Sequence, residues 1–202
     1  MAILYSIYYG VSEMKKYLPI LAIIALVVFV AGCVDSGTTN NTTSNITVPD
    51  IPSKTYAKNG ISFKYPQSWT NNLESSTPST ITTVGDPDSQ ESSGNVNTLA
   101  VIQKTSLPSG QTLKDTYDAT YANYKNDSTY QLVSERTFTL NGTTAYENIH
   151  KIDVSGTTKQ ERATWLEKNG TIYVILCGAL PADFDSQQTN FDLITYSFKV
   201  TA

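Results

Sequence analysis

Two thiols and one imidazole are the side chains of this sequence best suited to chemistry, at Cys33, Cys177 and His150. A histidine works as a general base only beside a nucleophile and an orienting acid. No Gly-x-Ser-x-Gly turn supplies a serine nucleophile for His150. His150 instead falls on a strand pattern, on the same side as Tyr146 and Ile152. We therefore interpret it as a partly buried strand histidine and expect no catalytic residue.

Metal-binding patterns are weak throughout the chain. A single histidine excludes a histidine-based metal cage, and two cysteines exclude a disulfide-dense scaffold. Cys177 lies in the most apolar run, where a free cysteine behaves as a small hydrophobic residue. The acidic cluster of Asp86, Asp88 and Glu91 lacks the twelve-residue spacing of an EF-hand and its final bidentate Glu. We interpret it as a surface loop and expect neither a metal nor a cofactor.

Cys33 ends a different kind of segment, MKKYLPILAIIALVVFVAGC, which begins at Met14. Two lysines, an apolar stretch from Tyr17 to Val30 and two small residues follow the order of a secretory signal. The apolar stretch is shorter than the about 20 residues that a membrane-spanning helix needs. The tetrapeptide VAGC resembles the lipobox of bacterial and archaeal lipoproteins, which implies cleavage before Cys33 and lipidation of its thiol. An uncleaved signal anchor is the alternative.

The sequence therefore divides into three parts. Residues 1–32 are expected to be a signal sequence, and residues 1–13 indicate a mis-assigned start before Met14. Residues 33–53 contain the lipidated Cys33 and a Thr/Asn/Ser/Pro-rich stretch without aromatic residues, which predicts a disordered tether. Residues 54–202 form the globular domain. Both the lipid anchor and the signal anchor place this domain on the extracytoplasmic face of the cell membrane.

Asn-x-Ser/Thr triplets are frequent, and in an exported chain each one is a candidate N-glycosylation site. Chance occurrence in a Thr/Asn-rich spacer explains the tether triplets equally well. Two others coincide with Asn-Gly turns, which already account for the Asn. The candidates are Asn40, Asn41 and Asn45 in the tether and Asn126, Asn141 and Asn169 in the domain.

The domain shows strand patterns separated by three Asn-Gly pairs, at Asn59, Asn141 and Asn169. Asn-Gly between β-prone runs is the strongest short-range signal for a two-residue hairpin. The run from Thr171 to Leu180 is apolar on both faces, which predicts a central strand covered on both sides. Leu99–Ile102 predicts another buried strand, and 81–84 an edge strand.

Two segments change to helical spacing. In residues 112–126, Leu113, Tyr117, Tyr121 and Tyr124 recur at intervals of four, four and three, with Thr112 as N-cap. Near the end, Pro181 and Asp183 mark the start of a second helix with apolar positions at 184, 191 and 194, and residues 196–200 predict a closing strand. The fold class is therefore α+β, a mostly antiparallel β-sheet covered by helices.

The opening ISFKYPQSW, with Phe63, Tyr65, Pro66 and Trp69, resembles the start of PsbP-like domains. A buried strand, a helix opened by Thr112-Leu113 and a final Ser-Phe-Lys strand follow in matching order. The resemblance covers about residues 54–200 and implies an α/β/α sandwich in an exported prokaryotic, archaeal or bacterial, lipoprotein. It supplies no transferable active site and no photosynthetic partner, because fold alone is not function.

Net charge narrows the function further. A formal charge of −4 argues against nucleic acid as a partner. We expect a membrane-anchored lipoprotein whose domain is a non-catalytic binding or assembly module for a protein partner, with the tyrosines of the first helix as core or, alternatively, as a recognition surface. The rival hypotheses are an exported enzyme of hydrolase type, and a passive glycosylated envelope component.

Overall fold

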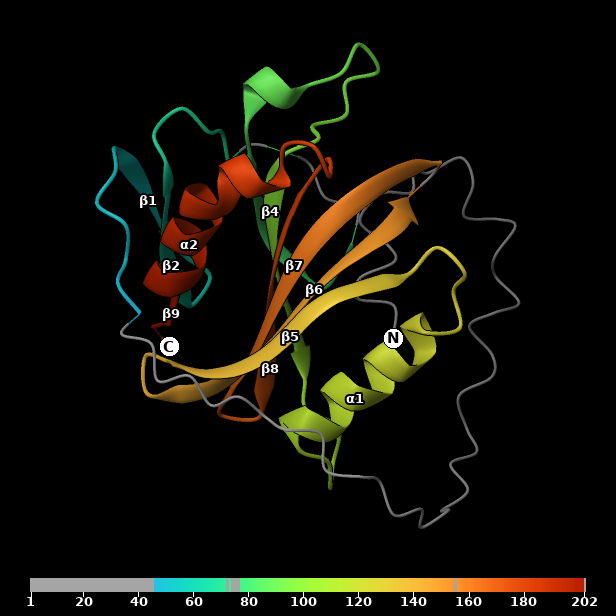
Figure 1. The fold of residues 1–202 in the computed structure, drawn as a ribbon. Coiled ribbons are helices and arrows are strands. Elements are labelled where there is room, and N and C mark those ends of the chain that lie inside the picture. The colour runs from blue at the N-terminus through green and yellow to red at the C-terminus, as the bar shows by residue number, and fades with distance from the viewer. Residues whose placement is uncertain (1–45, 72, 74–76, 155, 202) are drawn as a thin grey trace.

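The computed structural model describes residues 46–71, 73, 77–154 and 156–201, whose strands form two antiparallel sheets (Figure 1). The larger sheet has six strands in the order β3-β4-β8-β7-β6-β5, and the smaller has three in the order β1-β2-β9. The strands are β1 (Ser53–Lys58), β2 (Ile61–Pro66), β3 (Thr80–Gly85), β4 (Leu99–Ser106), β5 (Gln131–Leu140), β6 (Thr143–Val154), β7 (Thr157–Lys168), β8 (Thr171–Ala179) and β9 (Lys199–Val200). The helices are η4 (Pro87–Ser89), α1 (Leu113–Tyr124), η5 (Phe184–Gln187) and α2 (Gln188–Ser197).

The three predicted Asn-Gly hairpins are confirmed. Asn59, Asn141 and Asn169 have φ values of 56°, 49° and 53°, and the glycine after each also has positive φ. Two consecutive residues with positive φ match the twist of paired strands. These turns join β1 to β2, β5 to β6 and β7 to β8, and fix the registers of those pairs.

The larger sheet is covered on both faces, as the apolar run of β8 predicts. All residues of β8 after Thr171 are buried, and β3 forms the edge beyond β4. One face packs against α1 through a cluster that includes Tyr117, Tyr121 and Trp165. The other face packs against α2 and β2 through a cluster that includes Phe63, Trp69 and Phe191. The α+β class with helices on both faces is confirmed.

The C-terminal segment differs from the prediction in two details. Residues 184–187 form the 3-10 turn η5, and α2 begins only at Gln188, because Asp183 makes no side-chain capping bond. The final strand begins at Lys199 rather than Tyr196, since α2 continues to Ser197. β9 pairs with β2, so the chain end closes a separate small sheet.

Candidate functional site

An open groove of about 670 Å³ lies beside the start of α1, and three separate segments line it. They are the helix start at 112–114, the start of β6 at 142–146, and the end of β7 with its turn at 167–169. The antiparallel registers of β5, β6 and β7 bring the Asn141-Gly142 and Asn169-Gly170 turns to the same end of the sheet. A cleft of this size is the default place for a ligand or a partner segment.

The helix wall of the groove is fixed by a capping box. Thr112 N–H donates to Asp115 Oδ2 over 2.9 Å, and Asp115 N–H donates back to Thr112 Oγ1 over 3.2 Å. These hydrogen bonds satisfy two backbone donors that a helix start otherwise leaves free. The bond from the Thr112 backbone also holds the pKa of the Asp115 carboxyl below its ordinary value. The predicted N-cap is therefore confirmed.

The remaining lining is mixed in chemistry. Lys114 pairs with Asp118 across 2.6 Å, and Lys168 is exposed. Tyr146 is half-buried, with its ring centroid 5.4 Å from that of Tyr117. Glu167 Oε1 accepts the Gly170 N–H over 2.6 Å and so fixes the turn. The groove thus offers cations, hydroxyls and one aromatic ring on a rigid frame, which suits binding by a polar partner.

The tyrosines of α1 belong to the core rather than to a recognition surface. Tyr117, Tyr121 and Tyr124 are all buried, and the Trp165 indole N–H donates to the Tyr121 hydroxyl over 3.3 Å. Burial raises the pKa of the Tyr121 hydroxyl well above its ordinary value. These rings form the base on which the groove's Tyr146 rests.

His150 is fully buried on the α1 face, more deeply than the sequence predicts. Its Nδ1 lies 2.9 Å from Asn148 Oδ1, and its Nε2 lies 3.2 Å from Glu161 Oε2 without the alignment of a hydrogen bond. The rings of Tyr121, Tyr124 and Tyr130 contact the imidazole. An acid is therefore adjacent, but its other described neighbours are aromatic rings and an amide.

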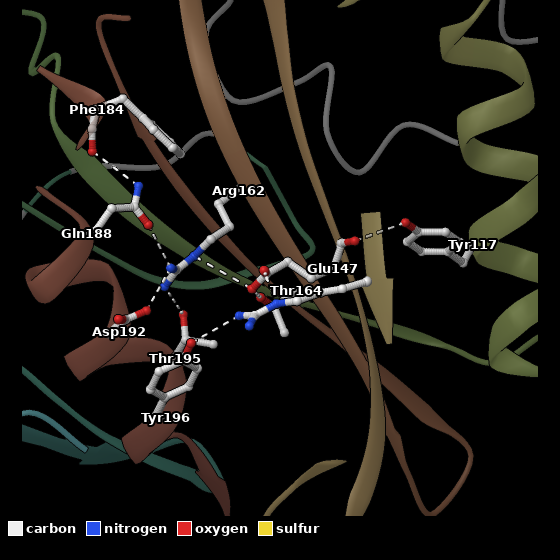
Figure 2. A network of polar contacts seen from close by, with 10 residues as sticks. Tyr117, Glu147, Arg162, Thr164, Phe184, Gln188, Asp192, Thr195 and Tyr196 are labelled. Carbon is white, nitrogen blue, oxygen red and sulfur yellow. Dashed lines mark hydrogen bonds and ion pairs between the residues drawn. The ribbon is translucent and has the colours of Figure 1, made fainter. Parts of the chain in front are cut away.

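A second polar network lies on the opposite face, and Figure 2 shows Arg162 at its centre. Glu147 accepts from Arg136 Nε over 2.6 Å and from Thr164 Oγ1 over 3.1 Å, and its Oε2 lies 3.7 Å from Arg162 Nε. Beneath α2, Arg162 donates to Asp192 over 2.7 Å and to Thr195 over 3.2 Å, and both Arg162 and Glu147 are only 3% exposed.

This network was not predicted from the sequence. Its signal is charged residues inside strongly β-patterned runs, which the cross-strand pair Glu147 and Thr164 shares with the adjacent Arg162. Each described carboxylate and guanidinium in it faces an opposite charge, so the network fastens α2 to the sheet and contains no free nucleophile among the described residues.

Cys177 is fully buried beside Arg162, its cross-strand neighbour. Burial raises the pKa of its thiol to about 12, and this effect exceeds the opposing pull of the guanidinium. A thiol with so little thiolate is a poor nucleophile and metal ligand. Its interpretation as a core residue is confirmed.

The three sequons of the domain differ in their surroundings. Asn126 and Asn169 are exposed. Asn141 is exposed as well, but its amide donates to the Phe198 carbonyl over 2.7 Å and so contacts the C-terminal segment. Cys33 and the tether sequons Asn40, Asn41 and Asn45 lie outside the described residues.

The acidic loop is held by its own hydrogen bonds. Asp86 accepts from the Asp88 N–H over 3.1 Å, and Glu91 accepts from Asn97 over 2.8 Å. Asn97 in turn accepts from the buried Lys159. Among the described residues, no three His, Cys, Asp or Glu side chains are grouped to hold a metal ion. The described helices include none that is long and apolar enough to cross a membrane.

Comparison with known proteins gives one family and two structures of the same fold. A family model described as PsbP-like protein matches residues 18–200. The solution structure of cyanobacterial PsbP from Synechocystis sp. PCC 6803 is 18% identical with a TM-score of 0.55, covering 79% of this chain and 98% of that one. LpqN of Mycobacterium tuberculosis, described as involved in cell envelope biogenesis, is 16% identical with a TM-score of 0.52, covering 82% of this chain and all of that one. No curated protein matches the chain.

Proposed function

Because this chain belongs to the PsbP-like protein family, we propose that it is a membrane-anchored extracytoplasmic lipoprotein whose domain acts as a non-catalytic binding or assembly module. Fold alone does not fix a function, so the proposal rests on the site. The observation that carries it is the groove beside α1, where three segments held by turns and a capping box present polar groups on a rigid frame.

The polar side chains outside the groove support a binding role over a catalytic one. His150 and Cys177 are fully buried, and Glu147 is occupied by Arg136 and Thr164. A general base must reach the proton that it removes, and a nucleophile must be ionised near neutral pH. The hydrolase alternative requires that buried groups become accessible.

The membrane part of the proposal rests on the N-terminal sequence. A lipid on Cys33 holds the chain at the surface, and the tether gives the domain a reach of roughly 25 Å. The description of LpqN as acting in cell envelope biogenesis agrees with this placement.

The test is crosslinking and co-purification of the full chain from native membranes with its anchor intact. Lys168→Glu reverses a charge in the groove, and Lys125→Glu makes the same change outside it, just after α1. We expect a stoichiometric protein partner with the native chain and with Lys125→Glu, and its loss with Lys168→Glu. Equal recovery with both variants would exclude the groove, and a chain that never gains a partner would exclude the binding module.

A further inference from the structure

The three Asn-Gly turns differ in a way that bears on their chemical stability. In an Asn-Gly pair, the glycine nitrogen is unhindered and can attack the Asn side-chain carbon to close a five-membered succinimide ring. The reaction needs a side-chain amide free to turn toward the backbone, and a glycine nitrogen able to lose its proton. The hairpins supply both requirements unequally.

Two of the three amides are held in place. Asn59 Nδ2 donates to the Tyr56 hydroxyl over 3.0 Å, and Asn141 Nδ2 donates to the Phe198 carbonyl over 2.7 Å. Asn169 is exposed, and its side chain makes no hydrogen bond to the part of the chain that the structure describes. Only the Asn169 amide therefore rotates without first breaking a contact.

The attacking atom is also different at this turn. The Gly170 N–H donates to Glu167 Oε1 over 2.6 Å. A short hydrogen bond from a donor to a carboxylate is the arrangement that general-base catalysis requires. No such carboxylate contacts the nitrogen of Gly60 or Gly142 within the described residues.

We propose that Asn169 is a site of self-catalysed deamidation, with Glu167 as the general base. Glu167 takes the proton from the Gly170 nitrogen while that nitrogen forms a bond to Asn169 Cγ. The side-chain nitrogen takes up a proton and leaves as ammonia, and the succinimide remains. Water then opens the ring, at Cγ to give aspartate or at the main-chain carbonyl carbon to give isoaspartate.

The change falls on the groove and does not depend on the proposed function. Either product places a carboxylate beside Lys168 on the groove wall. Isoaspartate also adds a methylene to the main chain of a two-residue turn, which disturbs its fit to β7 and β8. Both products destroy the sequon at Asn169, so glycosylation and deamidation exclude each other at this position.

Peptide mapping by mass spectrometry tests the proposal, with the purified full chain held in mildly alkaline buffer, folded or in urea. In the folded chain we expect Asn169 to convert at least about tenfold faster than Asn59 and Asn141, a modest share of what a general base supplies. In urea the three rates should converge, because the local contacts are gone. Equal rates in the folded chain, or Asn169 as the slowest site, would overturn the proposal.

Glu167→Gln separates base catalysis from simple exposure. The glutamine keeps an oxygen that can accept the Gly170 N–H but cannot remove a proton at neutral pH. We expect the rate at Asn169 to fall at least about tenfold while those at Asn59 and Asn141 stay unchanged. An unchanged rate at Asn169 would overturn the role of Glu167. If this variant does not fold, the comparison of folded and urea-treated native chain still decides whether Asn169 is the reactive site.

Discussion

Arg162 on β7 and Asp192 on α2 meet across 2.7 Å, which joins a buried charge of the sheet to the helix that covers it. Arg162 is 3% exposed and Asp192 30%, so the pair spans from the interior to the rim of α2. Glu147 faces the same guanidinium from β6. The position of α2 is therefore specified by charge as well as by apolar packing.

Removing the central carboxylate should be costly. Glu147→Leu leaves the buried Arg162 without its strand partner, and loss of one member of a buried ion pair typically costs about 3–5 kcal/mol of unfolding free energy. Adding Arg162→Met should recover most of this loss, since Arg136 is partly exposed and can turn into water. Urea unfolding of the single and double variants measures both effects. A double variant less stable than Glu147→Leu would contradict the explanation.

The exposed ion pair on α1 provides the contrast. Lys114 and Asp118 are each 53% exposed, so Lys114→Ala should change the unfolding free energy by no more than about 1 kcal/mol. The same urea titration at low and high salt checks this, because screening should remove what small contribution remains. A loss as large as that of Glu147→Leu would mean that burial does not distinguish the two pairs.

Thr112→Ala removes half of the capping box at the groove. The Asp115 N–H then loses its acceptor, and such N-cap replacements cost about 0.5–2 kcal/mol. Thr112→Ser retains the hydroxyl and should cost less. Amide hydrogen exchange in the first turn of α1 should accelerate in the alanine variant alone. Equal protection in the two variants would show that this cap does not stabilise the helix start.

Cys33→Ser tests the anchor separately from the groove. A serine cannot carry a thioether-linked lipid, so the variant should move from the membrane to the soluble fraction. Cys177→Ser, which changes the buried cysteine instead, should remain in the membrane. Fractionation with intact-mass measurement of both variants gives the answer. Retention of unlipidated Cys33→Ser in the membrane would favour the uncleaved signal anchor.

Much of the fold could be predicted because its signals are local. An Asn-Gly turn fixes the register of its hairpin within a few residues, and the Thr112 cap acts on Asp115 only three positions away. The pairing of β9 with β2 has no such signal. It joins Ile61 to Val200 across most of the domain, and only three-dimensional packing determines it.

The site was harder to predict for the same reason. The groove forms from three segments whose proximity depends on strand registers and on the placement of α1, so no single motif marks it. The burial of Glu147 and Arg162 was also missed, because a charged residue in a strand normally indicates a solvent-facing position. Cys177 was predicted correctly as buried, since its neighbours in sequence are apolar on both faces.

Alkaline conditions should destabilise the domain through buried acids that resist ionisation. Burial raises the pKa of the Cys177 thiol from 9.0 to about 12, and raises the pKa values of the Tyr117, Tyr121 and Tyr130 hydroxyls from 10.0. A group whose pKa is higher in the folded state stabilises fully below its unfolded pKa. That contribution is lost as pH rises, because the unfolded chain then releases a proton that the folded chain keeps.

For Cys177 alone, the expected loss is about 1.4 kcal/mol per pH unit between pH 9 and about 12. Urea unfolding across this range should show a steeper decline for the native chain than for Cys177→Ala, which has no thiol at this position to ionise. The alanine variant should still decline above pH 10, because the tyrosines remain. Near neutral pH, an alkylating reagent should modify Cys177 only when urea unfolds the chain. Rapid alkylation of the folded chain, or identical pH slopes for both proteins, would show that this thiol is not held protonated in the core.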